Sequence, residues 1–203
     1  MLKNFRLLAV VGGLMLPASG NVLANTEDDF SLEDLMQVEV VSNTKFSQQL
    51  SDIPAAAYVI SKEDIRMSGA SNLPELLNHV PGLVVASASS NSWAVGSRGF
   101  AGVFANKLLV MIDGRSLFSP VMSGVFWEMH DIYLPDIKRI EVIRGSGSST
   151  WGANAINGII NIITESSADT LKGHAYGRVG DHTKVDIGSR YGMELGHQAY
   201  ARF

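Results

Sequence analysis

Short apolar runs alternate with glycine-rich and polar stretches through the middle of the chain. Runs of β-branched and aromatic residues that are bounded by turn residues are typical of buried strands. Turn signals stand at Pro81-Gly82, before one such run, and at Asp113-Gly114, after another. The pattern predicts strands at residues 55–60, 83–85, 93–98, 108–112, 140–144 and 159–164.

Two helices are predicted after the first of these strands. Ser61 can cap the first helix together with Asp64, three residues further on, and Gly69 can end it. The second helix is expected to begin at Ser71 or Asn72 and to carry leucines on one face. Strands mixed with helices in this way indicate an α+β fold, a small sheet with helices packed on it. A stretch of this length can bury one hydrophobic core.

The C-terminal stretch has the two-residue period of strands with one polar and one apolar face. One segment aligns the polar residues Lys172, His174, Tyr176 and Arg178. The next aligns Val185, Ile187, Tyr191 and Met193 opposite Lys184, Asp186 and Arg190. Such alternation is typical of the wall of an outer-membrane β-barrel, and a soluble antiparallel meander with one wet face shows it as well. Residues 166–203 suffice for about three strands, whereas the smallest bacterial barrels need about eight. We therefore expect a compact module joined to the opening of a larger, truncated barrel.

The N-terminus predicts export. Lys3 and Arg6 precede an apolar run at residues 7–16, and small residues up to Ala24 resemble a signal-peptidase site. This apolar run is too short for a membrane-spanning helix, which needs about 20 residues. The whole chain has a formal net charge of −4, and cleavage after Ala24 would remove two basic residues. Because the exported chain would be acidic, nucleic acid is a poor candidate partner.

Composition removes several kinds of site. The chain has no cysteine, so disulfides and thiolate metal sites are excluded. Its five histidines lack the spacing that would place two of them on one helical face. Serine, histidine and acidic residues form no ordered catalytic pattern. We therefore predict no catalytic residue, no metal site and no cofactor.

The stretch "RIEVIRGSGSSTWGANAINGIINIIT" at residues 139–164 first suggests a phosphate-binding loop. Ser148-Ser149-Thr150-Trp151 stands where such a loop would end in Gly-Lys-Ser or Gly-Lys-Thr. The isoleucines that follow Gly158 favour a strand over the helix that a phosphate site requires. The glycines are better explained as a bend between two buried strands.

The same residues resemble a known family. The chain carries, in this order and at similar spacing, "VPGLVV", "SRGF", "NKLLVMIDG" and "DIKRIEVIRGSGSSTWGANAINGIINIIT". These blocks look like the plug domain of TonB-dependent outer-membrane receptors, with Ser146 in place of the family's usual proline. The resemblance implies an α+β plug domain, a small mixed sheet with short helices, followed by the first antiparallel strands of an incomplete transmembrane β-barrel. The expected division is a signal peptide at 1–24, a TonB-coupling segment at 25–49, the plug at 50–165 and barrel strands at 166–203.

The resemblance also implies a function, the active uptake of a scarce ligand across the cell outer membrane. The expected partners are TonB, a ligand such as a ferric siderophore or another metal chelate, and outer-membrane lipid around the barrel. Cobalamin and saccharides stay open as ligands. A free-standing periplasmic plug-like binding module and an exported hydrolase are the alternatives.

Three groups of site residues follow from the resemblance. The segment expected to pair with TonB by strand addition consists of Val38, Glu39, Val40, Val41 and Ser42, which could instead form a plain first strand of the plug. Ligand contacts are expected in loops at 87–93, 99–107 and 117–128, through Ser90, Asn91, Trp93, Phe104, Asn106, Phe118 and Met122. Arg98 and Arg144 are expected to lock the plug to glutamates of the barrel wall. The alternative is that Arg144 pairs with Glu141 or Asp113 inside the plug.

Overall fold

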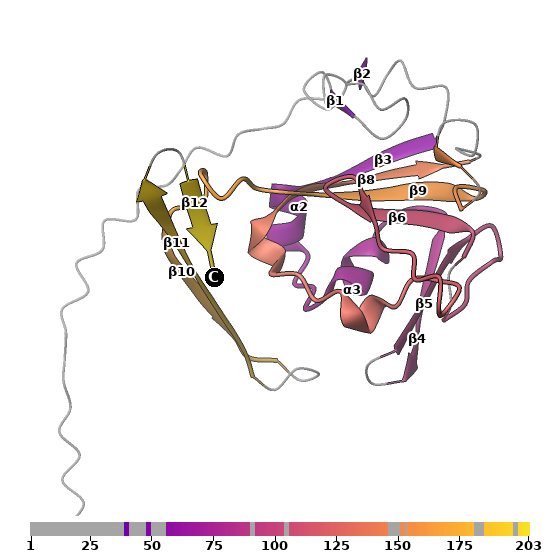
Figure 1. Cartoon of the computed structure of the whole chain (residues 1–203). Helices are drawn as coiled ribbons and strands as arrows, with labels where there is room; N and C mark the ends of the chain where they lie inside the picture. Colours follow the sequence, from indigo (N-terminus) through magenta and orange to yellow (C-terminus); the bar gives the residue numbers. More distant parts are fainter. Residues whose placement is uncertain are drawn as a thin grey trace, which may run out of the picture.

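The computed structural model of the chain divides into a mixed α+β unit and a separate antiparallel sheet (Figure 1). It describes residues 39–40, 48–49, 56–89, 92–103, 106–145, 151–152, 154–180, 185–196 and 199–203. The predicted signal peptide lies outside the described residues.

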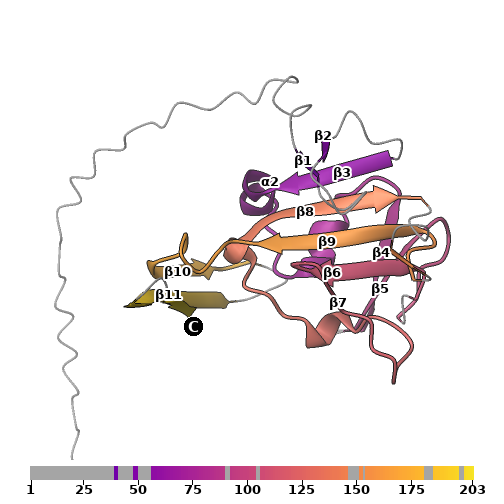
Figure 2. The same cartoon turned by 45° about the horizontal axis from the view of Figure 1, so that its top comes forward.

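A five-stranded mixed sheet forms the centre of the first unit. Its strand order is β3-β8-β9-β6-β7, and only the β6–β9 pair is parallel (Figure 2). The strands are β3 (Ala56–Ser61), β6 (Leu108–Ile112), β7 (Arg115–Ser116), β8 (Ile137–Arg144) and β9 (Gly158–Thr164). The predicted strand positions are confirmed. β8 begins earlier than expected because Ile137 already pairs with Thr164, the last residue of β9.

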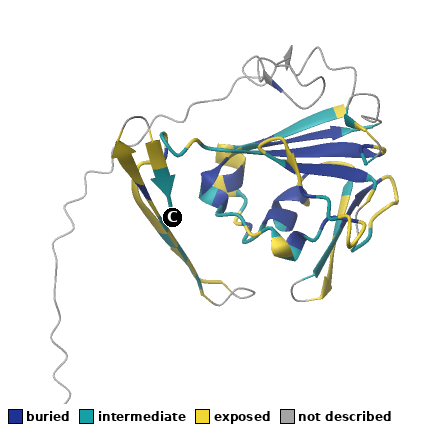
Figure 3. Cartoon of the chain, in the orientation of Figure 1, coloured by how far each residue is buried: buried dark blue, intermediate teal, exposed yellow. Residues whose placement is uncertain are grey.

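Two short helices cover one face of this sheet. Helix α2 (Lys62–Met67) begins at Ser61, which forms a capping box with Asp64. Helix α3 (Leu73–Leu77) begins at Asn72, whose side chain accepts a hydrogen bond from the Glu75 amide. Their apolar residues pack in the main core with inward residues of the sheet, including Ile60, Leu76, Leu77, Val110, Ile140 and Ile160. Figure 3 shows that the buried residues concentrate in this layer.

The opposite face of the sheet has a smaller core of its own. Successive strand residues point to opposite faces, so Leu109, Ile143 and Ile159 turn away from the helices and pack with Met111 and Ala155. Val40, from the two-residue strand β1 (Glu39–Val40), is fully buried in this outer cluster. β1 pairs with β2 (Gln48–Gln49). The expectation of one core is therefore incomplete, because both faces of the sheet are apolar and both are covered.

A β-hairpin extends beyond the helices on the side away from β1 and β2 (Figure 1). It consists of β4 (Leu83–Ser89) and β5 (Ser92–Ser97). The long connection from β7 to β8 contains two short 3₁₀ turns, η2 (Trp127–Met129) and η3 (Leu134–Asp136). Among the described residues, no helix is long and apolar enough to cross a membrane.

The C-terminal sheet lies beside the α2 end of the mixed unit. It contains β10 (Lys172–Arg178), β11 (Asp186–Gly196) and β12 (Ala199–Arg202), all antiparallel. The residues with polar side chains, His174, Tyr176, Arg178 and Arg190, turn toward the mixed unit. The apolar residues Val185, Ile187, Tyr191, Met193 and Leu195 are exposed on the other face. A soluble meander would bury its apolar face, so this arrangement favours a barrel wall.

Candidate functional site

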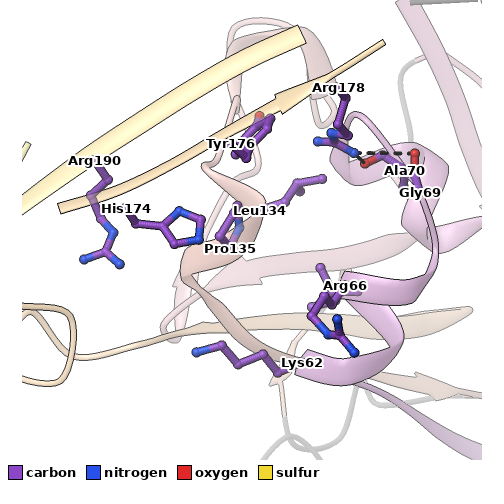
Figure 4. Close-up of a pocket in the computed structure, with 11 residues that line it drawn as sticks. Lys62, Arg66, Gly69, Ala70, Leu134, Pro135, His174, Tyr176, Arg178 and Arg190 are labelled. Carbon is purple, nitrogen blue, oxygen red and sulfur yellow. Dashed lines mark hydrogen bonds between the residues drawn. The ribbon is translucent and has the colours of Figure 1, made fainter. Parts of the chain in front are cut away.

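The described residues line a partly open cavity of about 390 Å³ between the mixed unit and the C-terminal sheet. Figure 4 shows basic side chains from both sides of this cavity. Each of the four is already paired: Lys62 with Glu165, Arg66 with Glu63, Arg178 with Asp186, and Arg190 with Asp136. Because these charges are neutralised locally, the cavity is an interface between two parts of the chain and has no excess positive charge for an anion.

Asp136 is the central charged residue of this interface. It ends η3 and is buried. Arg190 Nε of β11 lies 2.8 Å from its Oδ1, and Arg202 Nε of β12 lies 3.3 Å from its Oδ2. The Arg190 contact has the distance of an ion pair but not the angle of a hydrogen bond. One carboxylate of the mixed unit thus holds two strands of the C-terminal sheet.

The arginines also donate to backbone carbonyls. Arg190 donates to the Thr170 carbonyl, and Arg202 Nη1 donates to the Glu165 carbonyl at 3.0 Å. Arg178 donates to the Ala70 carbonyl at the end of the loop after α2. Its guanidinium lies 4.8 Å from the ring centroid of Tyr176. Arginine suits such positions because its planar fork can serve a carboxylate and a carbonyl at once.

Aromatic side chains complete the contact. The Tyr133 ring lies 5.6 Å from the Tyr176 ring, and its hydroxyl lies 2.7 Å from His174 Nδ1. Burial, together with the nearby Asp136 carboxylate, raises the pKa of Tyr133 above its ordinary value. The phenol therefore stays protonated at neutral pH and can donate its hydrogen to the imidazole.

Arg98 and Arg144 lie at the other end of the mixed sheet. Arg98 follows β5 in a left-handed conformation, φ 55°, and its Nη2 approaches Gly145, the residue after Arg144. Arg144 packs on Gly82, where an added Cβ would lie 2.4 Å from its Nη1. Neither arginine forms an ion pair with another described residue. Glu141, a possible internal partner, is paired with Arg139 at 2.9 Å.

Comparison with known proteins gives this architecture a family. The model of the TonB-dependent Receptor Plug Domain matches residues 49–159, more than half of the chain. This chain belongs to the TonB-dependent receptor plug domain family. The mixed unit is the plug, and the family places the chain in the outer membrane. The resemblance noted in the sequence is confirmed.

Relatives include transporters and receptors. The chain is 36% identical to the vitamin B12 transporter BtuB of Vibrio vulnificus over 130 residues, which cover 63% of this chain and 20% of that protein. It is 32% identical to the iron-regulated outer membrane virulence protein of Vibrio cholerae over 174 residues, 82% of this chain and 25% of that protein. The chain thus spans about a fifth to a quarter of the length of these relatives.

Solved structures agree on the fold. The pyoverdine outer membrane receptor FpvA from Pseudomonas aeruginosa superposes with a TM-score of 0.63 at 19% identity. The match covers 87% of this chain and 25% of that receptor.

The predicted ligand residues of the plug are spread over different environments. Trp93 lies in strand β5, pairs with Ser87 and packs against the main core. The expected loop at 87–93 is therefore wrong in its bounds, because the hairpin strands continue to Ser89 and resume at Ser92. Asn106 and Met122 are exposed, and Phe118 is half-buried. Ser90, Asn91 and Phe104 lie outside the described residues.

The predicted coupling residues of the plug are described only in part. Glu39 and Val40 form β1, while Val38, Val41 and Ser42 lie outside the described residues. Val40 is buried and paired with Gln48, so its side chain and one backbone edge of β1 are already engaged in this arrangement. Among the described residues, no group of three or more His, Asp or Glu side chains could hold a metal ion.

Sequence reasoning did not find the contact of Asp136 with Arg190 and Arg202. A signal was present, because Arg178, Arg190 and Arg202 all fall on the polar positions of the alternating tail. What they bind could not be read from this period, since Asp136 lies 54 and 66 positions earlier in the chain.

Proposed function

We propose that this chain forms the plug and the first barrel strands of a receptor that imports a metal chelate with energy from TonB. The observation that carries the proposal is the orientation of β10–β12. Their polar face holds the plug through Asp136, and their apolar face is exposed, as a lipid-facing wall requires.

The ligand class is supported by the relatives' names. The two relatives described above are named for vitamin B12 transport and for iron regulation, and the structural neighbour binds pyoverdine. Cobalamin and ferric siderophores share one property: each is a bulky organic chelate around a metal ion. The plug loops that hold Asn106, Phe118 and Met122 offer apolar and aromatic surface with a polar amide, which suits such a ligand.

TonB coupling belongs to the same proposal. Residues 38–42 include three β-branched valines, and an extended segment of this kind can add to the edge of a partner's sheet. In the structure β1 is held by the short β2 pairing and by the burial of Val40. Release of β1 from the outer cluster must therefore precede pairing with TonB.

Uptake by a complete receptor that carries these residues tests the function. The receptor is expressed in cells that lack their own chelate receptors, with and without TonB, and uptake of radioactive ferric siderophores and of cobalt-labelled cobalamin is measured. We expect TonB-dependent accumulation of one of these chelates. Accumulation of none of them, by a receptor shown to be present in the outer membrane, contradicts the proposal.

A pair of methionine variants tests the ligand surface. Met122 and Met67 are both exposed, Met122 in a predicted ligand loop and Met67 on α2. We expect Met122→Ala to weaken chelate binding severalfold and Met67→Ala to leave it unchanged, because an exposed methionine contributes little to folding. Equal affinities of the two variants would place the ligand elsewhere.

A further inference from the structure

Resting on the proposed receptor function, we propose that Asp136, Arg190 and Arg202 form a permanent anchor that fixes one end of the plug to the barrel wall throughout the transport cycle. We call these three residues the anchor. It differs in position from the predicted lock at Arg98 and Arg144. Its charges are also reversed, because here the plug supplies the carboxylate and the barrel strands supply the arginines. All three residues lie within the described part of the chain.

The anchor joins opposite charges of the plug and the barrel strands. The acidic group belongs to the plug and the two cations belong to neighbouring barrel strands, β11 and β12. The side chains are largely buried, with exposures of 7% for Asp136, 12% for Arg190 and 22% for Arg202. Removing either side would leave a charge in a poorly hydrated setting, which strongly disfavours separation.

The anchor also binds the linker between plug and barrel. β9 ends at Thr164 and β10 begins at Lys172. Between them, the Glu165 amide donates to the Asp136 carbonyl at 2.8 Å, and the two arginines donate to the carbonyls of Glu165 and Thr170. The linker is thus bound to the same residues that join the strands to the plug. Covalent and ionic connections coincide at this corner.

The backbone of β11 also touches this linker. A Cβ added at Gly192 would lie 2.1 Å from the Thr170 carbonyl oxygen. Only glycine allows such an approach without displacement. On the plug side, Lys62 of α2 pairs with Glu165 at 2.7 Å. Several independent contacts therefore hold the same corner in one arrangement.

The anchor and Arg144 lie at opposite ends of the plug. The anchor adjoins Ile137, the first residue of β8, whereas Arg144 is its last residue. At about 3.3 Å per residue, these ends are roughly 23 Å apart. Within the described residues, the N-terminal strand β1 forms two residue pairs, both with β2. A pull on β1 can therefore remodel the plug while the anchored corner stays in place.

The first experiment uses the 203-residue chain itself in detergent micelles. Asp136→Asn removes the anion, and Glu63→Gln removes the exposed pair with Arg66 as a matched control. We expect trypsin to cut at Lys172 about tenfold faster or more in Asp136→Asn, with backbone amides of β11 and β12 exchanging faster to the same extent. Glu63→Gln should behave as the parent chain.

A conservative variant covers the case in which Asp136→Asn does not fold. Arg202→Lys keeps the charge but cannot serve both Asp136 and the Glu165 carbonyl. We expect a smaller increase in cleavage at Lys172 than in Asp136→Asn. Cleavage equal to that of the parent chain in every folded variant overturns the anchor.

The second experiment asks whether the anchor stays closed during uptake. In a complete receptor that has no other cysteine, Asp136→Cys and Arg190→Cys are joined by a short thiol-reactive bridge; residues 1–203 themselves contain no native cysteine that would compete. We expect the unbridged double variant to admit a bulky antibiotic that the parent receptor excludes. The bridge should restore exclusion and leave chelate uptake intact.

The outcomes separate the anchor from the proposed function. If bridging abolishes chelate uptake while the parent receptor transports, this corner must open and the anchor is refuted. If the parent receptor itself takes up no chelate, the proposed function fails. The anchor as a plug–barrel contact is then decided by the cleavage and exchange of the 203-residue chain.

Discussion

Val40→Ala is expected to release the N-terminal strand of the plug without unfolding the rest. Val40 is fully buried against Leu109, Ile143 and Ile159 on the outer face of the sheet. Apart from this burial, its strand β1 is held by two residue pairs among the residues that the structure describes. The substitution deletes two methyl groups, at about 0.8 kcal/mol for each buried carbon. The cavity that remains adds to this loss, so the total is about 2 kcal/mol.

A loss of about 2 kcal/mol raises the open population of β1 roughly thirtyfold. The rate of hydrogen exchange of the backbone amide at position 40 measures this open population. In a complete receptor, cross-linking from position 39 to TonB should then increase in the absence of ligand, because the strand is released before the ligand binds. This expectation rests on the proposed coupling segment.

Two valine controls separate local release from general destabilisation. Val84→Ala removes the same atoms from a valine of β4 that is 48% exposed. It should change neither the amide exchange of β1 nor the cross-linking to TonB. Val110→Ala weakens the main core on the helix side of the sheet, so it should lower global stability without favouring exchange of β1. Exchange of the position-40 amide that is unchanged in Val40→Ala would refute the reasoning. Faster exchange with unchanged cross-linking would refute only the coupling segment.

Two further predictions concern the plug's second helix and its contact with the barrel strands. Burial would raise the pKa of Glu75, but hydrogen bonds led by those from Ser71 outweigh it and lower the pKa below the ordinary 4.5. The Glu75 carboxylate therefore stabilises the fold fully above pH 4.5, and this contribution is lost as the pH falls through the lowered pKa. The free energy of unfolding, measured by chemical denaturation at several pH values, should fall less steeply toward acid pH in Glu75→Gln than in the parent chain. Gly188→Val should destabilise the packing of β10–β11 by about 1–3 kcal/mol, because the added Cβ would lie 2.4 Å from the Tyr176 ring. The rate of trypsin cleavage in the β10–β11 hairpin measures this loss. Gly177→Val is the control, because nothing lies within 4 Å of an added Cβ at that position. Equal sensitivity would show that Tyr176 moves aside freely.

Local patterns of the sequence were enough for most of the elements. The Ser61 capping box, the Asp113-Gly114 turn and the runs of isoleucine around Ile160 depend on neighbours a few positions away, and each produced the expected element. The motif blocks identified the plug family, which the family comparison confirmed. The two-residue period of the tail predicted its strands, but it did not decide whether the apolar face would be exposed, as in a barrel wall, or buried, as in a soluble meander.

Only the tertiary structure decided which residues meet. The burial of Val40 and the contact of Asp136 with Arg190 and Arg202 join segments that are far apart in the chain, and no local period encodes such a pairing. The bounds of the hairpin at Trp93 were also set by pairing across strands and not by the polarity of the residues. Propensity and capping act over one or two turns of chain, so they specify elements. The burial of charge and apolar surface acts across the whole fold, so it alone specified how the plug is joined to the barrel strands.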